Sequence, residues 1–376
     1  MGVMKLEEFV YPAEWVQHSQ SWIGWPERPD NWRKDGKPAQ EAFVKLIETL
    51  SKYEKITVAA SISSWKQCRN LLPSNVRIVE IQTNDCWLRD TGPIFLTRKV
   101  PCEGSTNICG VDFAFNAWGG SLEGCYPDWE YDSLVTSKIL EIERIPRVEA
   151  SLVLEGGAVV TDGEGTIITT EECLLNRNRN PGMTKKEVEA KLKEYLHVEK
   201  VIWLPFGVYG DIDTDGHVDN LCMFAKAGHV VLHWTEDRQD PQYKRSATAL
   251  EILENSTDAR GKKFQIHKVL GPAPQYRTEE EIKELQFTNF RMALSRNTGQ
   301  RLPASYVNAY IGNGVVILPS YDDPNDKLAL DLFQELFPER SVVQVPAREI
   351  LLGGGGIHCV VLEQPSVNFQ LPTHKK

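Results

Sequence analysis

Residues 184–234 read TKKEVEAKLKEYLHVEKVIWLPFGVYGDIDTDGHVDNLCMFAKAGHVVLHW, and this segment contains one complete α/β unit. Its first part predicts an amphipathic helix, because its larger apolar residues fall on one helical face. The rest predicts three apolar strands, with a polar loop between the first strand and the other two. The helical face and the strands are, in order, Val188, Leu192, Tyr195 and Leu196, then VEKVIWLP, NLCMFA and HVVLHW.

The same order of helix, strand, polar loop and further strands recurs along the chain. The other four copies have predicted helices over residues 63–72, 131–143, 249–255 and 325–337. In the last of these, Leu328, Leu332 and Leu336 lie in line on one face. We therefore predict an α/β protein built of five repeated helix-strand-strand modules, forming one domain over residues 1–376.

One polar residue stands at the corresponding stage of each module, and corresponding loops of a closed ring of repeats converge on its axis. This favours a ring over the alternative, an open α/β sheet with helices on both faces. The five residues are Asp90, Glu155, Asp219, Asn308 and Cys359.

The composition of the chain indicates which binding partners and which cellular compartment to expect. The formal net charge of −10 argues against a nucleic-acid partner and suits a cationic small molecule. The N-terminal segment has acids and Pro12 where a signal peptide needs a long apolar core, and no stretch approaches the ~18 apolar residues of a membrane span. Eight cysteines form no CxxC pair, which predicts free thiols, no zinc site and a cytoplasmic protein.

The loop GDIDTDGHVDN over residues 210–220 invites comparison with a calcium-binding loop. Counting from Asp211, the residues Asp213, Asp215 and Gly216 fit that motif, but its twelfth position is Cys222, a poor ligand for a hard cation. The flanking runs also predict strands rather than helices. A calcium-binding module is therefore disfavoured, and we expect calcium to leave the thermal stability unchanged.

The stretch GGGGIHCVV over residues 353–361 contains the candidate nucleophile. Its four glycines mark backbone that allows a close approach, so Gly356 is included among the expected substrate contacts. Cys359 follows at the expected mouth of a strand, and the alternative is a buried thiol that acts only as a small apolar residue. His358 would point to the opposite face of such a strand, which makes His217 the better partner for the thiol.

Acidic residues accompany that histidine in the sequence. If the run GHVDN is extended, His217 and Asp219 share one face, although a solvated loop with an incidental histidine stays open. Glu155 ends an apolar strand, where a carboxylate needs a partner, and His217 is a natural one. Asp90 stands next to Arg89 and forms either a local ion pair or, with Trp87 beside it, a site for a cation.

Taken together, these residues hold more negative charge than a cysteine protease needs. A surplus of carboxylates beside a thiol indicates a positively charged electrophile, and a guanidinium gripped through its nitrogens fits best.

Four long stretches resemble the agmatine deiminases of the guanidino-group modifying (pentein) superfamily, in the order found in that family. The resemblance covers about residues 15–365, with no matched motif at 100–110 and 271–300. It implies a five-bladed α/β propeller with pseudo-fivefold symmetry and the active site on the central axis. The stretches are NDCWLRDTGPIF, LEGGAVVTDGEGTIITTEECLLNRNRNPG, GDIDTDGHVDN and GGGGIHC.

The resemblance also implies a role for each matched residue. Cys359 resembles the nucleophile that attacks the guanidinium carbon of agmatine. Asp90 and Asp219 resemble the pair that binds the guanidinium nitrogens. His217 is similar to the general acid and base, and Glu155 to the carboxylate that orients it.

The expected reaction yields N-carbamoylputrescine and ammonia for polyamine synthesis, with no metal and no organic cofactor. Trp87 is expected to pack at the substrate. The aspartates Asp211, Asp213 and Asp215 favour solvated loop positions, with Asp213 retained as a candidate contact to the distal amine. The oligomeric state stays open, with a homodimer as one candidate.

Two enzyme classes compete with this prediction. A deiminase of free or peptidyl arginine would need a cationic clamp for a carboxylate, and the motif loops offer Arg89, Arg177 and Arg179. A Cys-His-Glu hydrolase or acyltransferase would cleave esters or amides instead.

Overall fold

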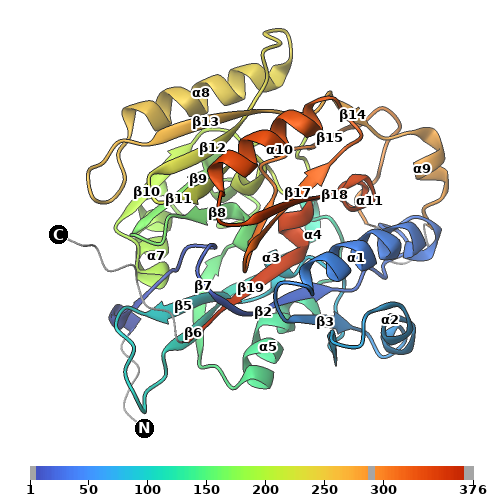
Figure 1. Cartoon of the computed structure of the whole chain (residues 1–376), viewed down its shortest axis with the longest axis horizontal. Coiled ribbons are helices and arrows are strands. Elements are labelled where there is room, and N and C mark those ends of the chain that lie inside the picture. Colours follow the sequence, from blue (N-terminus) through green and yellow to red (C-terminus); the bar gives the residue numbers. More distant parts are fainter. Residues whose placement is uncertain (1–5, 287–292, 368–376) are drawn as a thin grey trace.

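The computed structural model describes residues 6–286 and 293–367, and it shows a mixed α/β fold (Figure 1). Five sheets of three or four strands share one plan. In each, two antiparallel strands are followed by a long helix and then by a strand that pairs in parallel with the second strand. The repeated plan fits the recurrence seen in the sequence.

The short outer strand β1 (Phe9–Val10) belongs to the first sheet. The five sheets follow one another in the chain order of their antiparallel pairs. They are β5 (Ile94–Arg98), β6 (Ile108–Ala114), β7 (Arg147–Val153); β8 (Val159–Thr161), β9 (Thr166–Thr170), β10 (Lys200–Leu204); β11 (Cys222–Lys226), β12 (His229–Trp234), β13 (Gln265–Leu270); β16 (Tyr310–Gly312), β17 (Val315–Ser320), β18 (Ser341–Pro346); and β19 (Val361–Pro365), β2 (His18–Gly24), β3 (Ile56–Ala60), β4 (Arg77–Glu80).

The last sheet joins the two ends of the described chain. Strand β19 pairs antiparallel with β2, and Figure 1 shows this red strand beside the blue one. The boundaries between the sheets do not coincide with those between the predicted modules, because each predicted module begins at a helix and each sheet begins at an antiparallel pair. Strand β10, for example, completes the sheet of β8 and β9, whereas the pair β11 and β12 begins the next sheet. The structural unit is therefore an antiparallel pair, a helix and a strand.

The long helices connect the second strand of each sheet to its parallel neighbour. They are α1 (Lys37–Leu50), α5 (Val135–Glu143), α7 (Lys185–Leu196), α8 (Pro241–Asn255) and α10 (Asn325–Leu336). Shorter helices are α2 (Trp65–Leu71), α3 (Leu88–Thr91), α4 (Gly120–Glu123), α6 (Glu171–Leu174), α9 (Glu279–Lys283), α11 (Arg348–Leu352) and α12 (Ile357–Val360).

Minor elements complete the description. They are a two-stranded sheet of β14 (Gln275–Tyr276) and β15 (Arg301–Leu302), and the 3-10 turns η1 (Leu6–Glu8), η2 (Lys34–Gly36), η3 (Asp132–Leu134), η4 (Gly156–Ala158) and η5 (Val218–Asn220).

Helix α7 forms where its sequence predicts it. Thr184 and Glu187 make a capping box at its start, which satisfies free backbone N–H groups there. Val188, Leu192 and Leu196 are buried against strands of the neighbouring sheets. The helix ends at His197, which adopts a left-handed conformation.

The apolar face predicted for residues 325–337 is confirmed in part. In α10, Ala329 and Phe333 are buried and Leu332 and Leu336 pack half-buried against the same core, whereas Leu328 is 53% exposed. The inner face is therefore rotated slightly from the line of the three leucines.

None of the helices in the described part of the chain has the length and apolar character needed to cross a lipid bilayer.

Candidate active site

Each of the five sheets has a short turn just before its first strand, and these turns meet. Helix α12 contacts α3, α3 contacts η4, and η4 contacts η5. The fifth turn contributes Asn308, whose side-chain N–H donates to the carbonyl of Asp219 at 3.5 Å and whose Oδ1 accepts from the N–H of His358 at 2.9 Å. The five polar residues expected to converge, Asp90, Glu155, Asp219, Asn308 and Cys359, lie in or next to these turns.

Cys359 lies in the helical turn α12, not at the mouth of a strand as predicted. The glycines before it allow this turn, because a Cβ on Gly356 would lie 2.2 Å from Oδ1 of Asn308. The Sγ atom accepts from the N–H of Gly356 at 3.4 Å and from Nδ2 of Asn308 at 3.3 Å. It lies 3.6 Å from Oδ2 of Asp219.

The surroundings of the thiol disfavour its ionisation in the empty protein. Burial, followed by the negative charges of Asp219 and Asp90, raises the pKa of Cys359 well above its ordinary value. A bound cation would offset both charges.

His217 lies fully buried between two carboxylates. Its Nδ1 is 3.9 Å from Oδ2 of Asp90, and its Nε2 is 3.7 Å from Oε2 of Glu155. Burial alone would lower the pKa of His217, but Asp90 first, then the neighbouring Cys173 and Glu155, outweigh it and hold the pKa well above its ordinary value.

The segment after His217 is the 3-10 turn η5 rather than the extended run predicted from GHVDN. His217 and Asp219 still face a common space. A Cβ on Gly157 would lie 2.6 Å from Nδ1 of His217, 3.0 Å from Oδ2 of Asp219 and 3.0 Å from Oδ1 of Asp90. Only glycine leaves room for all three groups.

The two aspartates are held by different donors. Asp90 accepts from the N–H of Gly157 and from the indole N–H of Trp118, each at 2.9 Å. Asp219 accepts at Oδ2 from Nδ1 of His358 at 2.8 Å. Its buried Oδ1 has no hydrogen-bond partner among the described residues, so this oxygen is available to a ligand.

Glu155 is held by Arg179, which the sequence had suggested as a clamp for a substrate carboxylate. Nε of Arg179 donates to Oε1 of Glu155 at 2.6 Å, and both side chains are fully buried. Burial alone would raise the pKa of Glu155, but the Arg179 guanidinium outweighs it and holds the pKa at about 2. Glu155 is thus a carboxylate beside the imidazole.

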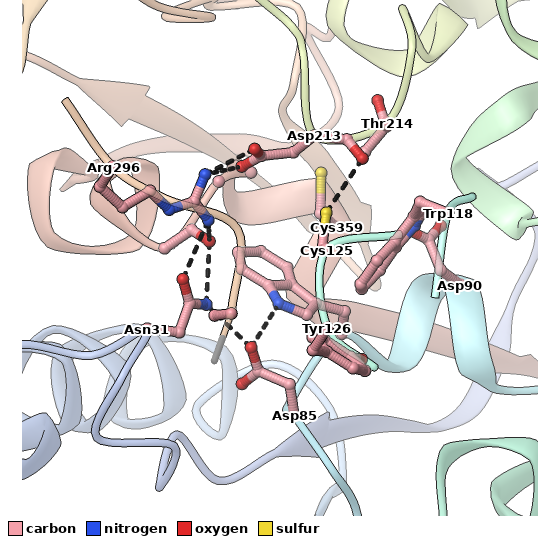
Figure 2. A pocket seen from close by; sticks show the side chains of 15 residues that line it. Asn31, Asp85, Asp90, Trp118, Cys125, Tyr126, Asp213, Thr214, Arg296 and Cys359 are labelled. Atoms are coloured by element: carbon pink, nitrogen blue, oxygen red, sulfur yellow. Dashed lines mark hydrogen bonds and ion pairs between the residues drawn. The ribbon is translucent and has the colours of Figure 1, made fainter. Parts of the chain in front are cut away.

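A pocket of about 380 Å³ leads to Cys359 (Figure 2). Its wall includes Trp87, whose indole N–H donates to Asp85 at 3.0 Å and whose ring stacks on Trp32. The remaining lining residues are Asn31, Asp90, Trp118, Cys125, Tyr126, Asp213, Thr214, Ala293, Arg296, Gly353, Gly354 and Gly355. Aromatic faces and carboxylates in one narrow pocket suit an elongated organic cation.

The acid-rich loop is buried rather than solvated, which corrects the prediction for its aspartates. Asp211 accepts from Thr214 Oγ1 at 2.6 Å and from the N–H of His217 at 3.1 Å. Asp215 accepts from Arg179 at 2.9 Å. Asp213 reaches the pocket, but both of its oxygens accept from Nη1 of Arg296, at 2.5 and 2.7 Å (Figure 2).

Arg296 was missed because it belongs to the stretch 271–300, where no motif was matched. The arginines proposed from the motif loops do not line the pocket. Arg89 pairs with Glu363 at 2.7 Å, Arg177 is an exposed partner of Glu123, and Arg179 holds Glu155.

The predicted strand geometry would have pointed His358 away from the thiol. In the structure, His358 contacts Asp219 of the site and also Glu14. Its Nε2 lies 3.1 Å from Oε2 of Glu14, and its Nδ1 bonds Asp219. Burial and Arg89 would lower the pKa of His358, but Glu14 and Asp219 raise it to about 9. The imidazolium fixes one oxygen of Asp219.

Sequence and structure comparisons place this arrangement among known proteins. Residues 10–365 match the family model of Porphyromonas-type peptidyl-arginine deiminases. The family match and the relatives therefore place the chain among hydrolases that act on a guanidino C–N bond.

Close relatives specify the family. The chain is 50% identical over 364 residues to an agmatine deiminase of Medicago truncatula and 49% identical to one of Pseudomonas savastanoi pv. phaseolicola, covering 96% of this chain and 97% of each relative. The solved agmatine deiminase of Enterococcus faecalis superposes with a TM-score of 0.90 at 40% identity, covering 96% of this chain and 97% of that one. The chain belongs to the agmatine deiminase family.

Proposed function

We propose that the chain hydrolyses agmatine to N-carbamoylputrescine and ammonia, a step toward putrescine, through a covalent intermediate on Cys359. The observation that carries this proposal is the convergence of two carboxylates, Asp90 and Asp219, and the imidazole of His217 around Gly157, with Asp219 3.6 Å from the buried thiol of Cys359. The high identity to agmatine deiminases supports the choice of substrate.

The five sheets would stand around a common axis as blades of a propeller. Support comes from the contacts that run through α12, α3, η4, η5 and Asn308 and back to α12. The five polar residues would then surround the axis, with the active site upon it.

Substrate binding would prepare the nucleophile. The guanidinium would lie between Asp90 and the free Oδ1 of Asp219, with its carbon toward Sγ of Cys359. Its charge would offset the two carboxylates that oppose ionisation of the thiol, so that the thiol releases its proton to bulk water and the thiolate forms where the electrophile is bound. The N–H of Gly356 and Nδ2 of Asn308 would stabilise it.

The first chemical step would form a bond from Sγ to the guanidinium carbon. The imidazolium of His217 would give its proton to the departing nitrogen, which leaves as ammonia. The carbon–nitrogen bond breaks, and a cationic amidino-thioether remains on Cys359. Glu155, held by Arg179, would keep the imidazole in position.

The second step would use the neutral His217 as a base. A water molecule gives a proton to His217 and attacks the same carbon, and the carbon–sulfur bond breaks. The products are the urea group of N-carbamoylputrescine, the Cys359 thiolate and the His217 imidazolium, and the second proton of the water would pass to the released ammonia to give ammonium. The protonation states of Cys359 and His217 then return to those at the start of the first step.

The far end of the pocket leaves a second substrate in consideration. Asp213 would accept the distal ammonium of agmatine in competition with Arg296. With free arginine, Asp213 would bind the ammonium and Arg296 the carboxylate of the substrate. An arginine deiminase is therefore the second candidate function. Gly356 would contribute through its backbone N–H, and Trp87 through its aromatic face.

The proposal is tested by ammonia release from agmatine, free arginine and a blocked arginine peptide, with Cys359→Ser as the inactive control. Release from agmatine with kcat/KM at least ~100-fold above the other two supports it. Preferential turnover of either arginine substrate would reject the specificity, and no release from any would reject the reaction. A cytoplasmic location and a homodimer stay predictions.

A further inference from the structure

A cluster of three potential metal ligands lies behind the candidate catalytic imidazole. Glu155, Cys173 and His217 each offer a ligand atom, and the three atoms lie within 4.8 Å of one another. All three side chains are buried. Cys173 comes from α6, which is distant in sequence from the other two, so no metal-binding motif was visible in the sequence.

Two of the ligand atoms have unsatisfied bonding capacity. Among the described residues, neither Nε2 of His217 nor Oε2 of Glu155 has a hydrogen-bond partner, and both are buried. They are 3.7 Å apart. With metal–ligand bonds of roughly 2.0–2.3 Å, the ligands of a tetrahedral zinc ion are separated by roughly 3.3–3.8 Å. The pair is already spaced as two ligands of one ion.

We propose that Glu155, Cys173 and His217 form an inhibitory binding site for a thiophilic divalent cation, of which Zn²⁺ is the prototype. A thiolate, an imidazole and a carboxylate are all favourable zinc ligands, and three protein ligands leave a fourth position for water. The ion would be a regulator or inhibitor and not a cofactor of the reaction.

The ligands would bind in their metal-binding forms. Cys173 would bind as a thiolate and His217 through an imidazole nitrogen, and any protons displaced by the ion pass to solvent.

The imidazole separates Asp90, which lines the substrate pocket, from Glu155. Nδ1 of His217 lies 3.9 Å from Asp90, and Nε2 lies 3.7 Å from Glu155. An ion that enters from the pocket would therefore have to pass the imidazole. Because the ring must move to admit the ion, we expect slow, time-dependent binding.

The functional consequence rests on the proposed function. A His217 bound to the ion through Nε2 keeps only its Nδ1 proton and cannot alternate between imidazolium and neutral imidazole, so the hydrolase would lose its acid and base. Metal binding itself does not depend on that assumption. The two claims can therefore be separated by experiment.

Cobalt(II) serves as a spectroscopic probe, because a bound thiolate gives a charge-transfer band in the near ultraviolet. The full-length protein is titrated as wild type and as Cys173→Ala, Cys359→Ala and Cys109→Ala. Cys109 is a matched control, since its thiol is buried in the same apolar cluster as Cys173. We expect one cobalt per chain and the band in all proteins except Cys173→Ala, with loss of the band on adding zinc.

The cobalt–thiolate band of the wild type and of Cys359→Ala tests the proposal even if Cys173→Ala does not fold. Its absence from the wild type would overturn the site, and so would its loss in Cys359→Ala, which would place the ion on the nucleophile. Persistence in folded Cys173→Ala would also overturn it.

Inhibition is measured separately as deiminase activity after incubation with zinc. We expect Cys173→Ala to need at least ~10-fold more zinc than wild type and Cys109→Ala, and we expect a chelator to restore activity. Equal zinc sensitivity of the Cys173 variant would overturn the inhibitory role. If no substrate is turned over but the thiolate band appears, the proposed function fails and the metal site stands.

Discussion

At the scale of single residues, the two oxygens of Asp219 have different surroundings. Oδ2 accepts from the imidazole of His358, and Oδ1 is left without a partner among the described residues. A carboxylate that is anchored on one side keeps its free oxygen in a fixed direction, which lowers the cost of ordering it when the ligand binds.

Asn308 is expected to contribute to catalysis although the sequence marked it only as a position in the repeat. Asn308→Ala removes the Nδ2 hydrogen-bond donor to Sγ. We expect kcat to fall by about 10²-fold, the size of effect seen when a preorganised hydrogen-bond donor is removed from other enzymes. Asn308→Asp should be worse, because it adds negative charge beside the thiolate. The measurement is kcat on agmatine, with the rate of thiol alkylation against pH as a second readout. Unchanged values in both would contradict the assignment.

His358 should make stability depend on pH in the neutral to alkaline range. Its pKa is raised from 6.5 to about 9, so its contribution is complete below about pH 6.5 and is lost as the pH rises through about 9. Between these values the folded protein binds about one more proton than the unfolded chain. The free energy of unfolding should fall by up to ~1.4 kcal/mol per pH unit from this group.

The test compares urea unfolding of wild type and His358→Gln from pH 6 to 9.5. We expect the wild type to lose more stability over this range than the variant. The carboxylates that face His358, Asp219 and Glu14, titrate at acid pH because their pKa values are lowered, so they do not obscure the comparison. Parallel pH profiles of the two proteins would show that His358 is not protonated.

At the scale of elements, the short turns before the first strands set the geometry of the site. Gly157 in η4 is a sensitive position, because an added Cβ would crowd His217, Asp219 and Asp90 together. We expect Gly157→Ala to lower kcat/KM for agmatine by about 10²-fold or more, since a displacement of 1 Å is costly in catalysis.

Gly110→Ala provides a matched control for that substitution. Its Cβ would press on the flexible end of Leu140, away from the site. We expect it to lower the Tm while the activity per folded molecule is kept. If both variants lost activity in proportion to their stability, Gly157 would have only a structural role.

The elements also show what the sequence could predict. Helix α7 has a capping box and a regular apolar face, so its bounds follow from local chemistry. The helical turn at Cys359 does not, because the glycines permit many conformations and the choice depends on Asn308 in another sheet. Arg296 and Cys173 were missed for a related reason, since only tertiary packing brings them to Asp213 and His217.

At the scale of the whole molecule, the two ends of the described chain pair in one sheet. The side chain of Gln364 in β19 accepts from Gln20 and from the indole of Trp22, each at 2.9 Å, and Thr57 donates to Gln20 at 2.6 Å. This pairing joins residues more than 300 positions apart, so no local pattern of the sequence could have revealed it.

Gln364→Leu should therefore destabilise the fold without altering the chemistry. It leaves the buried donors of Gln20 and Trp22 unpaired, at a cost of about 1–3 kcal/mol each. Urea unfolding should show a lower midpoint, and kcat per folded molecule should stay within about twofold of wild type. A wild-type midpoint would indicate that these bonds do not hold the ends together.

The central claim is that Cys359 attacks the guanidinium carbon and retains the amidino group for part of the cycle. The most direct test is intact-mass spectrometry of protein mixed with agmatine and quenched by acid within the first turnover, followed by peptide mapping. We predict a species heavier by the mass of agmatine less ammonia, located on Cys359 and absent from Cys359→Ser. Turnover of agmatine with no such species, or with the added mass on another cysteine, would contradict the mechanism.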